Sequence, residues 1–366
     1  MEEVSQMKVV IVGAGRVGLS LASMLKDAGG YEVRLVDCTD EALSAARSRG
    51  MEASFADAAR RDDVRRLLAG ADVLVAAVPD RLVPALAQAA ANAGIHYLDF
   101  SEAGDETISG AAGQDPDKAF LTGCGVSPGL VDAVAYHLAL RFDPGCDLDV
   151  RVGAIPARRG NRLGYGVIWN LDGLIAEYTE PCSAIVDGRR VELPALSGLV
   201  GFAAGGVDYE AFHTAGALDA LQGLVSARAR NLTFRTIRYP GHLDYMQFLL
   251  DDLDLRSRRD LLTTVLRNGL PLDGPDALVI QVKASGARGG APAEAEFCCR
   301  IEPKAGQGGQ GALTLASAAH AATLIEMLRT GELHGQGLRQ CALTPHETIF
   351  CSAFFAPLTS RMLEAA

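Results

Sequence analysis

The chain has 366 residues, of which 49% are hydrophobic and 22% are charged. These fractions are typical of a globular protein, and the length predicts two domains that each bury their own core. The formal net charge of −11 argues against nucleic acid or an anionic membrane as the partner, because proteins that bind either gather Lys and Arg on one face.

Localisation and metal binding are predicted from what the sequence lacks. Its apolar runs are strand-length, well short of the roughly 20 residues that cross a bilayer. The acidic start MEEVSQ leads into a strand, unlike a signal peptide, and the eight cysteines form neither a C-x-x-C pair nor a zinc-like cluster with histidine. We therefore expect a cytoplasmic protein with free thiols, no membrane partner and no metal.

The first third of the chain alternates short apolar runs with helical patterns. Strands are expected at 8–12, 32–37, 51–57, 72–79, 95–101 and 119–125, and helices at 16–29, 40–50, 60–71 and 81–94. Strand–helix alternation with short connections predicts an α/β domain of the Rossmann type, a doubly wound parallel sheet with right-handed crossovers. We assign residues 1–125 to this domain.

The pattern changes near residue 145 to longer strands with period-2 alternation. Strands are expected at 147–156, 162–170, 183–194, 232–240, 276–286 and 295–304, and helices at 217–228, 242–252, 256–268 and 312–332. Residues 286–296 are expected to form a hairpin loop and 305–311 a glycine-rich connection. We predict an α+β domain with a mixed, largely antiparallel sheet at 126–311, and expect residues 312–366 to pack back on the first domain.

The sequence Gly13-Ala-Gly15-Arg-Val-Gly18 follows a strand and opens a helix. In a dinucleotide-binding loop, Gly13 permits the tight turn, Gly15 lets a pyrophosphate approach the backbone, and Gly18 allows the helix to pack closely on the strand. Asp37 ends the next strand, where its carboxylate accepts hydrogen bonds from ribose hydroxyls and repels a 2′-phosphate. The cofactor is therefore predicted to be NAD, with NADP disfavoured.

Other strand ends complete the predicted nucleotide site, because ligands of open α/β sheets lie outside the carboxyl ends of the strands. The turn at Ala77 to Pro79 is expected beside the nicotinamide ribose, and Asp57 beside the adenine. The full predicted cofactor-binding set is Gly13, Gly15, Arg16, Val17, Gly18, Asp37, Cys38, Asp57, Ala77, Val78, Pro79 and Ser101.

Several segments together resemble the saccharopine dehydrogenase-like family. They are GIHYLDFS (94–101), TGCGVSPGLVD (122–132), GAIPARRGNRLGYGVIWNLDGLIAEYTEPC (153–182), AFHTAG (211–216) and RTIRYPGH (235–242). WNLDGLIAEYTEPC and AFHTAG are most similar to the lysine 6-dehydrogenase branch. Saccharopine reductases usually carry an NRDS element where this chain has residues 213–216, which argues against a second dicarboxylate moiety in the substrate.

The resemblance implies a substrate site on the second domain, and a sheet there that supports homodimers. The expected substrate-binding residues are Cys124, Ser127, Tyr165, Trp169, Asn170, Glu177, His213 and Thr214. Hydride leaves only from a neutral amine, so the reaction needs a proton acceptor. His213 is the expected base, with Asp99, Glu102 and Tyr165 as competitors.

Structural roles stay open for several of these residues. Trp169 also suits a core position at a strand end, and Glu177 suits the charged face of a surface helix. Cys124 is expected to line the pocket rather than to act as a nucleophile, because amine oxidation needs no covalent intermediate. Arg238 and His242 are interpreted as scaffold residues of the second domain.

The predicted function is NAD-dependent oxidation at the terminal carbon of lysine or a related diamino acid. The alternative within the same family is the reverse chemistry, reductive condensation of an amine with an oxo acid or aldehyde. A third possibility is a nucleotide-binding protein without turnover, against which the intact glycine motif argues.

Overall fold

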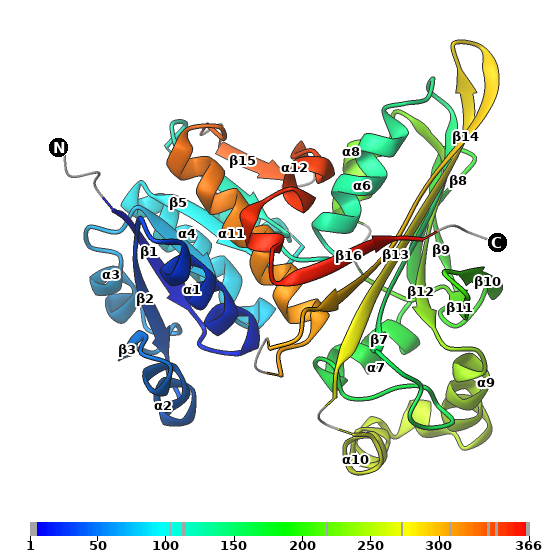
Figure 1. Ribbon diagram of the computed structural model, residues 1–366, viewed down its shortest axis with the longest axis horizontal. Helices are drawn as coiled ribbons and strands as arrows, with labels where there is room; N and C mark the ends of the chain where they lie inside the picture. The colour runs from blue at the N-terminus through cyan, green and yellow to red at the C-terminus, as the bar shows by residue number, and fades with distance from the viewer. Residues whose placement is uncertain are drawn as a thin grey trace. The chain divides into compact units, whose positions relative to one another are not determined.

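The computed structural model describes residues 6–102, 104–111, 115–216, 219–271, 274–306, 309–334, 337–340 and 343–363. It divides into two compact units. Unit 1 comprises Met1–Leu130 and Thr314–Ala356, and unit 2 comprises Val131–Leu313 and Pro357–Ala366. Each unit is built on one β-sheet (Figure 1).

The sheet of unit 1 is parallel throughout, with the strand order β15-β6-β5-β4-β1-β2-β3. Its strands are β1 (Met7–Val12), β2 (Tyr31–Asp37), β3 (Glu52–Phe55), β4 (Val73–Ala76), β5 (His96–Asp99), β6 (Ala119–Thr122) and β15 (Gly337–Gln340). Val, Ile and Leu side chains of β1 and β4 are buried, as expected for strands covered on two faces. The predicted doubly wound parallel sheet is confirmed.

Helices lie on both faces of this sheet (Figure 1). They are α1 (Arg16–Ala28), α2 (Asp40–Ser48), α3 (Arg61–Leu67), α4 (Val83–Ala93), α5 (Asp105–Gly110), α11 (Ala312–Thr330) and α12 (His346–Phe350). Helix α4 ends at Gly94, whose positive φ of 64° forms a left-handed C-cap that L side chains rarely adopt. All of α11 except its first two residues belongs to unit 1.

Unit 2 contains a mixed, largely antiparallel sheet with the order β10-β11-β12-β7-β13-β14-β16, and β8 pairs with β12 and β9. Its strands are β7 (Cys146–Pro156), β8 (Cys182–Val186), β9 (Arg189–Leu193), β10 (Val200–Ala204), β11 (Val207–Phe212), β12 (Ala229–Arg238), β13 (Asp276–Arg288), β14 (Ala291–Pro303) and β16 (Leu358–Met362). Only β7 and β12 pair in parallel among the described strands of this sheet. The predicted mixed second sheet is confirmed.

The helices of unit 2 are α6 (Leu130–Ala139), α7 (Leu171–Thr179), α8 (Asp219–Val225), α9 (His242–Gln247) and α10 (Arg259–Gly269). A π-helical turn (Phe248–Asp252) and a 3₁₀ turn (Leu255–Ser257) connect α9 to α10. Apolar side chains from α7, α9 and α10 pack together in one core cluster that includes Leu174, Leu243 and Leu262.

The strand predicted at 162–170 is wrong, because this segment is a loop. The side-chain amide of Asn161 donates to the Tyr165 carbonyl oxygen (2.7 Å) and accepts from the Tyr165 N–H (3.3 Å), so it occupies the groups that a sheet neighbour would bind. Gly164 has a φ of 65°, which also departs from strand geometry.

Other boundaries differ from the sequence prediction. Residues 183–194 form a hairpin, because Asp187-Gly188 has the positive φ values of a two-residue turn. Residues 286–296 are mostly strand, with the turn at Gly289-Gly290. The chain passes between units at Leu130 rather than at 125, and residues 357–363 belong to unit 2, where β16 pairs with β14.

Four strands have no counterpart in the prediction: β10, β11, β15 and β16. Residues 217–218 of the predicted helix 217–228 and residues 307–308 of the predicted connection 305–311 lie outside the described residues.

Candidate functional site

Two glycines of the loop in unit 1 are closely packed, and the third faces open space. A Cβ on Gly13 would overlap the Ala77 carbonyl oxygen, and one on Gly18 would overlap the Gly13 carbonyl oxygen. A Cβ on Gly15, in contrast, would have no described heavy atom within 4 Å. Gly15 is also the N-cap of α1, so the loop leaves room for a ligand at the N-terminus of the helix, where the first backbone N–H groups have no acceptor within the helix.

Asp37 connects the end of β2 to this loop. Its Oδ2 accepts the Ala14 N–H (2.8 Å), while its Oδ1 accepts the N–H (2.9 Å) and the hydroxyl (2.8 Å) of Thr39. The carboxylate is half-buried, so it supports the loop and remains accessible at the carboxyl end of the sheet. In the described α1 helix, the first turn holds no acidic residue that would repel a phosphate.

The other predicted cofactor residues follow the carboxyl ends of the parallel strands. Ala77 comes directly after β4 and donates its N–H to the Val12 carbonyl oxygen at the end of β1 (2.8 Å). Asp57 lies two residues after β3, accepts the Ala59 N–H (2.9 Å) and lies 3.9 Å from Arg60. Arg16, Val17, Cys38, Val78, Pro79 and Ser101 also lie in the first turn of α1 or directly after β2, β4 and β5.

Asp99 is a buried carboxyl that holds the loop after β6. Its Oδ1 accepts the N–H groups of Ser101 (3.1 Å) and Gly123 (3.2 Å), and its carbonyl oxygen accepts the Cys124 N–H (2.7 Å). Burial raises the pKa of Asp99 to about 7, although these hydrogen bonds lower it. Cys124 is fully buried, and the Oγ of Ser127 is buried without a hydrogen-bond partner among the described residues.

A second group of polar side chains lies in unit 2, where α7 and α9 meet the end of β12. We call it the Glu177 cluster, and it consists of Tyr165, Trp169, Glu177, Tyr178, Arg238 and His242. Hydrogen bonds, ion pairs or ring contacts link Glu177, Tyr178, Arg238 and His242 to one another. The Arg238 guanidinium lies over the Tyr165 ring, which meets the His242 ring edge-on.

Trp169 rests on helix α7. A Cβ on Gly173 would lie 2.6–2.7 Å from the Cζ3 and Cη2 atoms of the indole, so the missing side chain lets the ring lie against the helix. Trp169 is half-buried and packs on the core cluster that includes Tyr165. Asn170 caps α7, with its Oδ1 accepting the Asp172 N–H (3.0 Å), so this oxygen already has a structural role.

Glu177 and Arg238 form the charged centre of the cluster. The Arg238 Nη2 lies 4.0 Å from the Glu177 Oε2, and the side chains are 3% and 26% exposed, so Glu177 is the more accessible of the two. Burial raises the pKa of Glu177 to about 7, and the nearby guanidinium offsets part of that rise. A carboxyl that titrates near neutral pH suits proton transfer.

His213 and Thr214 project from opposite faces of the unit 2 sheet. Glu210 lies beside Arg238 in the register of β11 and β12, so both side chains project from one face. His213 is three residues beyond Glu210 and projects from the other face. Thr214 returns to the face of Arg238, where its Oγ1 lies 2.7 Å from the Thr236 Oγ1.

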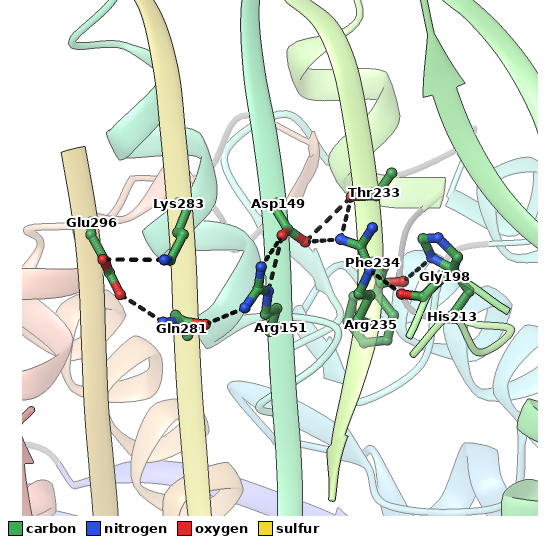
Figure 2. Close-up of polar contacts among 10 residues, drawn as sticks. All are labelled: Asp149, Arg151, Gly198, His213, Thr233, Phe234, Arg235, Gln281, Lys283 and Glu296. Atoms are coloured by element: carbon green, nitrogen blue, oxygen red, sulfur yellow. Dashed lines mark hydrogen bonds and ion pairs between the residues drawn. The ribbon is translucent and has the colours of Figure 1, made fainter. Parts of the chain in front are cut away.

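His213 belongs to a polar network on that other face (Figure 2). Its Nδ1 lies 3.0 Å from the Phe234 carbonyl oxygen, and a Cβ on Gly198 would overlap its Nε2. Burial lowers the pKa of His213, and Arg235 lowers it further, against the hydrogen bond to Phe234. The structure therefore separates His213 from the Glu177 cluster.

Arg235 continues this network across the strands (Figure 2). Asp149 pairs with Arg235 and with Arg151 (2.5 Å), and Arg151 donates to Gln281 (2.9 Å). Gln281 donates to Glu296 (2.7 Å), which lies 3.7 Å from Lys283. We call these residues, from β12, β7, β13 and β14, the polar sheet face.

Arg238, Tyr178 and His242 are the residues of the cluster that sequence analysis did not assign to a site. A signal was present, since Arg238 and His242 both stand in RTIRYPGH, one of the segments that carry the family resemblance. What the sequence lacked was the contact between this segment and α7, because Tyr178 and Arg238, which form a hydrogen bond, are 60 positions apart along the chain.

The described part of the chain was also searched for metal-binding groups and for membrane-spanning helices. No three His, Cys, Asp or Glu side chains there are grouped to hold a metal ion. None of the described helices is long and apolar enough to cross a membrane.

The parallel sheet, its glycine loop and the carboxylate at the end of β2 are the features of a dinucleotide-binding domain. Comparison with known families agrees. Residues 9–118 match the saccharopine dehydrogenase NADP binding domain, and residues 125–350 match the saccharopine dehydrogenase C-terminal domain. The chain belongs to the saccharopine dehydrogenase family. It is an NAD(P)-dependent oxidoreductase that acts on an amino acid or amine.

Solved structures with the same fold include two that extend over almost the whole chain. Apo saccharopine dehydrogenase (L-Glu forming) from Saccharomyces cerevisiae is 14% identical, with a TM-score of 0.81 over 98% of this chain and 100% of that one. Homospermidine synthase from Legionella pneumophila in complex with NAD is 12% identical, with a TM-score of 0.64 over 98% and 93%. At these identities the likeness concerns the fold.

Gly15 provides a test of the nucleotide site. We expect Gly15→Ala to weaken NAD(H) binding at least about tenfold, because the new methyl group enters the open space over the loop. The φ of −73° at Gly15 is one that alanine adopts, so any fall in Tm should match that of the same change at another N-cap. Gly104→Ala is the matched control, since Gly104 is also an N-cap with a φ of −73° and open space around its Cβ. If NADH fluorescence titration gives the Gly15 variant the same affinity as the wild type, the pyrophosphate does not bind at this loop.

Proposed function

We propose that the protein oxidises the terminal amine of lysine or a related diamino acid with NAD⁺, and that the Glu177 cluster binds the amine. The observation that carries this proposal is the position of Glu177. It is a half-buried carboxyl with its pKa raised to about 7, beside a guanidinium that is almost fully buried.

Glu177 suits two successive tasks in such a reaction. As a carboxylate it attracts the substrate ammonium, and it then accepts the proton that must leave before the amine nitrogen can support hydride loss. When bound, NAD⁺ accepts the hydride from the carbon that bears the amine. Trp169, which is half-buried, supplies flat apolar surface for the aliphatic chain of the substrate and a π-face for its cationic end.

This assignment moves the base from His213 to Glu177. His213 projects from the face of the sheet opposite to Arg238, and its Nδ1 is engaged by the Phe234 carbonyl oxygen. Asp99 is fully buried and its carboxyl accepts two backbone N–H groups, which suits a structural role. Tyr165 keeps its hydroxyl proton at working pH, because burial raises its pKa to about 12.

The second candidate function is reductive condensation of an amine with an oxo acid or aldehyde, which the same cluster would serve in the opposite direction. Glu177 would then return a proton to the newly formed secondary amine. The sequence favours the oxidative direction with a small amine, because residues 213–216 are HTAG where saccharopine reductases carry the arginine of NRDS.

The test measures NADH formation from NAD⁺ and a panel of diamino acids across pH. The wild-type kcat/KM should rise with pH through about 7, because Glu177 must be deprotonated to accept a proton. Glu177→Gln should lower kcat/KM by about 10²–10⁴-fold and remove this rise. Glu180→Gln, a change on the exposed residue that follows the same helix, is the control and should leave the profile intact.

Two results would overturn the proposal. A Glu177→Gln variant that keeps the acid limb of the profile would exclude Glu177 as the acceptor. NADH consumption with amine plus oxo acid, without NADH formation from any diamino acid, would establish the condensation reaction instead.

We further propose that NAD is preferred over NADP, because the Asp37 carboxylate at the end of β2 would repel a 2′-phosphate. Asp37→Asn should raise kcat/KM for NADP⁺ relative to NAD⁺ by about tenfold or more, since about 1.4 kcal/mol of lost repulsion has that effect. Asparagine keeps an oxygen that can accept the Ala14 N–H. Asp40→Asn is the control on the same connection, and an unchanged coenzyme ratio in the Asp37 variant would reject the assignment.

The homodimer that the family resemblance implies is proposed to form through the polar sheet face. Its charges alternate across four strands, and Lys283 and Glu296 remain 43% and 30% exposed, over a hollow of about 700 Å³. A face of mixed sign complements its own copy across a two-fold axis. Analytical ultracentrifugation should give twice the mass of one chain, and Lys283→Glu should shift it towards the monomer. A monomeric wild-type chain would contradict this.

A further inference from the structure

A chain of directed hydrogen bonds lies behind the Glu177–Arg238 pair. The His242 Nδ1 lies 2.9 Å from the Leu163 carbonyl oxygen, and its Nε2 lies 2.9 Å from the Tyr178 hydroxyl. The same hydroxyl lies 2.9 Å from the Arg238 Nε. All three side chains are buried, so water does not replace these contacts.

The chemistry of each group gives every bond in this chain one direction. A carbonyl oxygen only accepts, so the proton of His242 is on Nδ1. Burial, with the charge of Arg238, lowers the pKa of His242 to about 3, so the imidazole is neutral and its Nε2 accepts. Tyr178 therefore donates its proton to His242, and its oxygen is left to accept from the Arg238 Nε–H.

The guanidinium is thereby held at several points. Arg238 Nε donates to Tyr178, Nη1 donates to the Ile237 carbonyl oxygen (2.9 Å), and Nη2 is left facing Glu177. The Arg238 Cζ lies 4.8 Å from the centroid of the Tyr165 ring and 5.8 Å from that of Tyr178. These contacts fix where the positive charge lies relative to the Glu177 carboxyl.

Few other charges compete for Glu177. The titratable groups that face it are Arg238 from β12, Tyr165 from the preceding loop, Cys182 from β8 and its neighbour Tyr178 on α7. Burial raises the pKa of Tyr165 and of Cys182 to about 12 and that of Tyr178 further, so these three are neutral at working pH. Among these four groups, Arg238 alone carries a charge at working pH, so its position determines the electrostatic effect on Glu177.

We propose that Tyr178 and His242 are positioning residues that aim the Arg238 guanidinium at Glu177 and so keep this carboxyl in its proton-accepting form. The inference rests on the proposed function, since it assigns Glu177 the role of acceptor. Tyr178 and His242 act through Arg238 and do not themselves contact the reacting atoms.

Tyr178→Phe tests the chain with the least disturbance, because the ring and its contact with Arg238 remain while the hydroxyl is lost. The acid limb of kcat/KM should move up by about one pH unit, as part of the roughly 1–3 units that an opposite charge at this distance exerts. Tyr245→Phe on α9 is the control and should leave the limb in place, since Tyr245 is half-buried on the same helix as His242 and is not a member of the cluster.

His242 variants provide the second measurement, including the case in which Tyr178→Phe does not fold. His242→Gln keeps an oxygen that can accept from the Tyr178 hydroxyl and should retain most of the wild-type profile. His242→Leu removes the acceptor and should shift the limb as Tyr178→Phe does. Thermal unfolding and NADH binding show whether each variant is folded.

A double-mutant cycle shows whether the effect passes through Arg238. Arg238→Met alone should give the largest upward shift, and adding Tyr178→Phe to it should move the limb no further. Additive shifts, or an unmoved limb in both Tyr178→Phe and His242→Leu, would overturn the positioning chain. If instead Glu177→Gln keeps the acid limb, the proposed function fails first, so the two failures are distinguishable.

Discussion

The arrangement of unit 2 depends on a guanidinium buried between tyrosine rings. An isolated charge in a protein interior is strongly destabilising, so Arg238 requires acceptors that stay in place. The Tyr178 hydroxyl and the Ile237 carbonyl oxygen supply them, and the Tyr165 ring covers one face of the cation. Because these acceptors come from α7, β12 and the loop before α7, satisfying one charge holds three segments together.

Strand parity keeps two polar systems apart in the same sheet. Arg235 and Arg238 are three residues apart on β12, so their side chains project from opposite faces. Arg238 serves the Glu177 cluster, while Arg235 joins Asp149 and the polar sheet face. A one-residue slip of β12 would turn each of the two arginines to the opposite face of the sheet. The register between β12 and its neighbours must therefore be closely specified.

Much of unit 1 was predictable from sequence because its signals are local. Buried parallel strands read as apolar runs, the glycines at 13 and 18 each meet a steric requirement that the structure displays, and Gly15 faces the open space expected for a ligand. Strand β15 escaped prediction, since four residues at the edge of a sheet carry little pattern.

The site in unit 2 was harder to predict, because its members meet only through tertiary packing. The loop at 162–170 resembles a strand until the side chain of Asn161 occupies the backbone groups of Tyr165. The face of His213 depended on β11, a strand that the sequence did not reveal.

The connectivity of unit 1 has a consequence for its biosynthesis. Its sheet is completed by β15 and packed by α11, and both segments follow the whole of unit 2 in the chain apart from β16. The Nδ1–H of His320 on α11 donates to the Gly125 carbonyl oxygen (2.7 Å), which ties this late segment to the loop after β6. At about 5–20 residues per second, the ribosome takes on the order of ten seconds or more to add the roughly 200 residues between β6 and α11. During that interval β15 and α11 have not been synthesised, so the sheet of unit 1 can be completed only after residue 340 has been added to the chain.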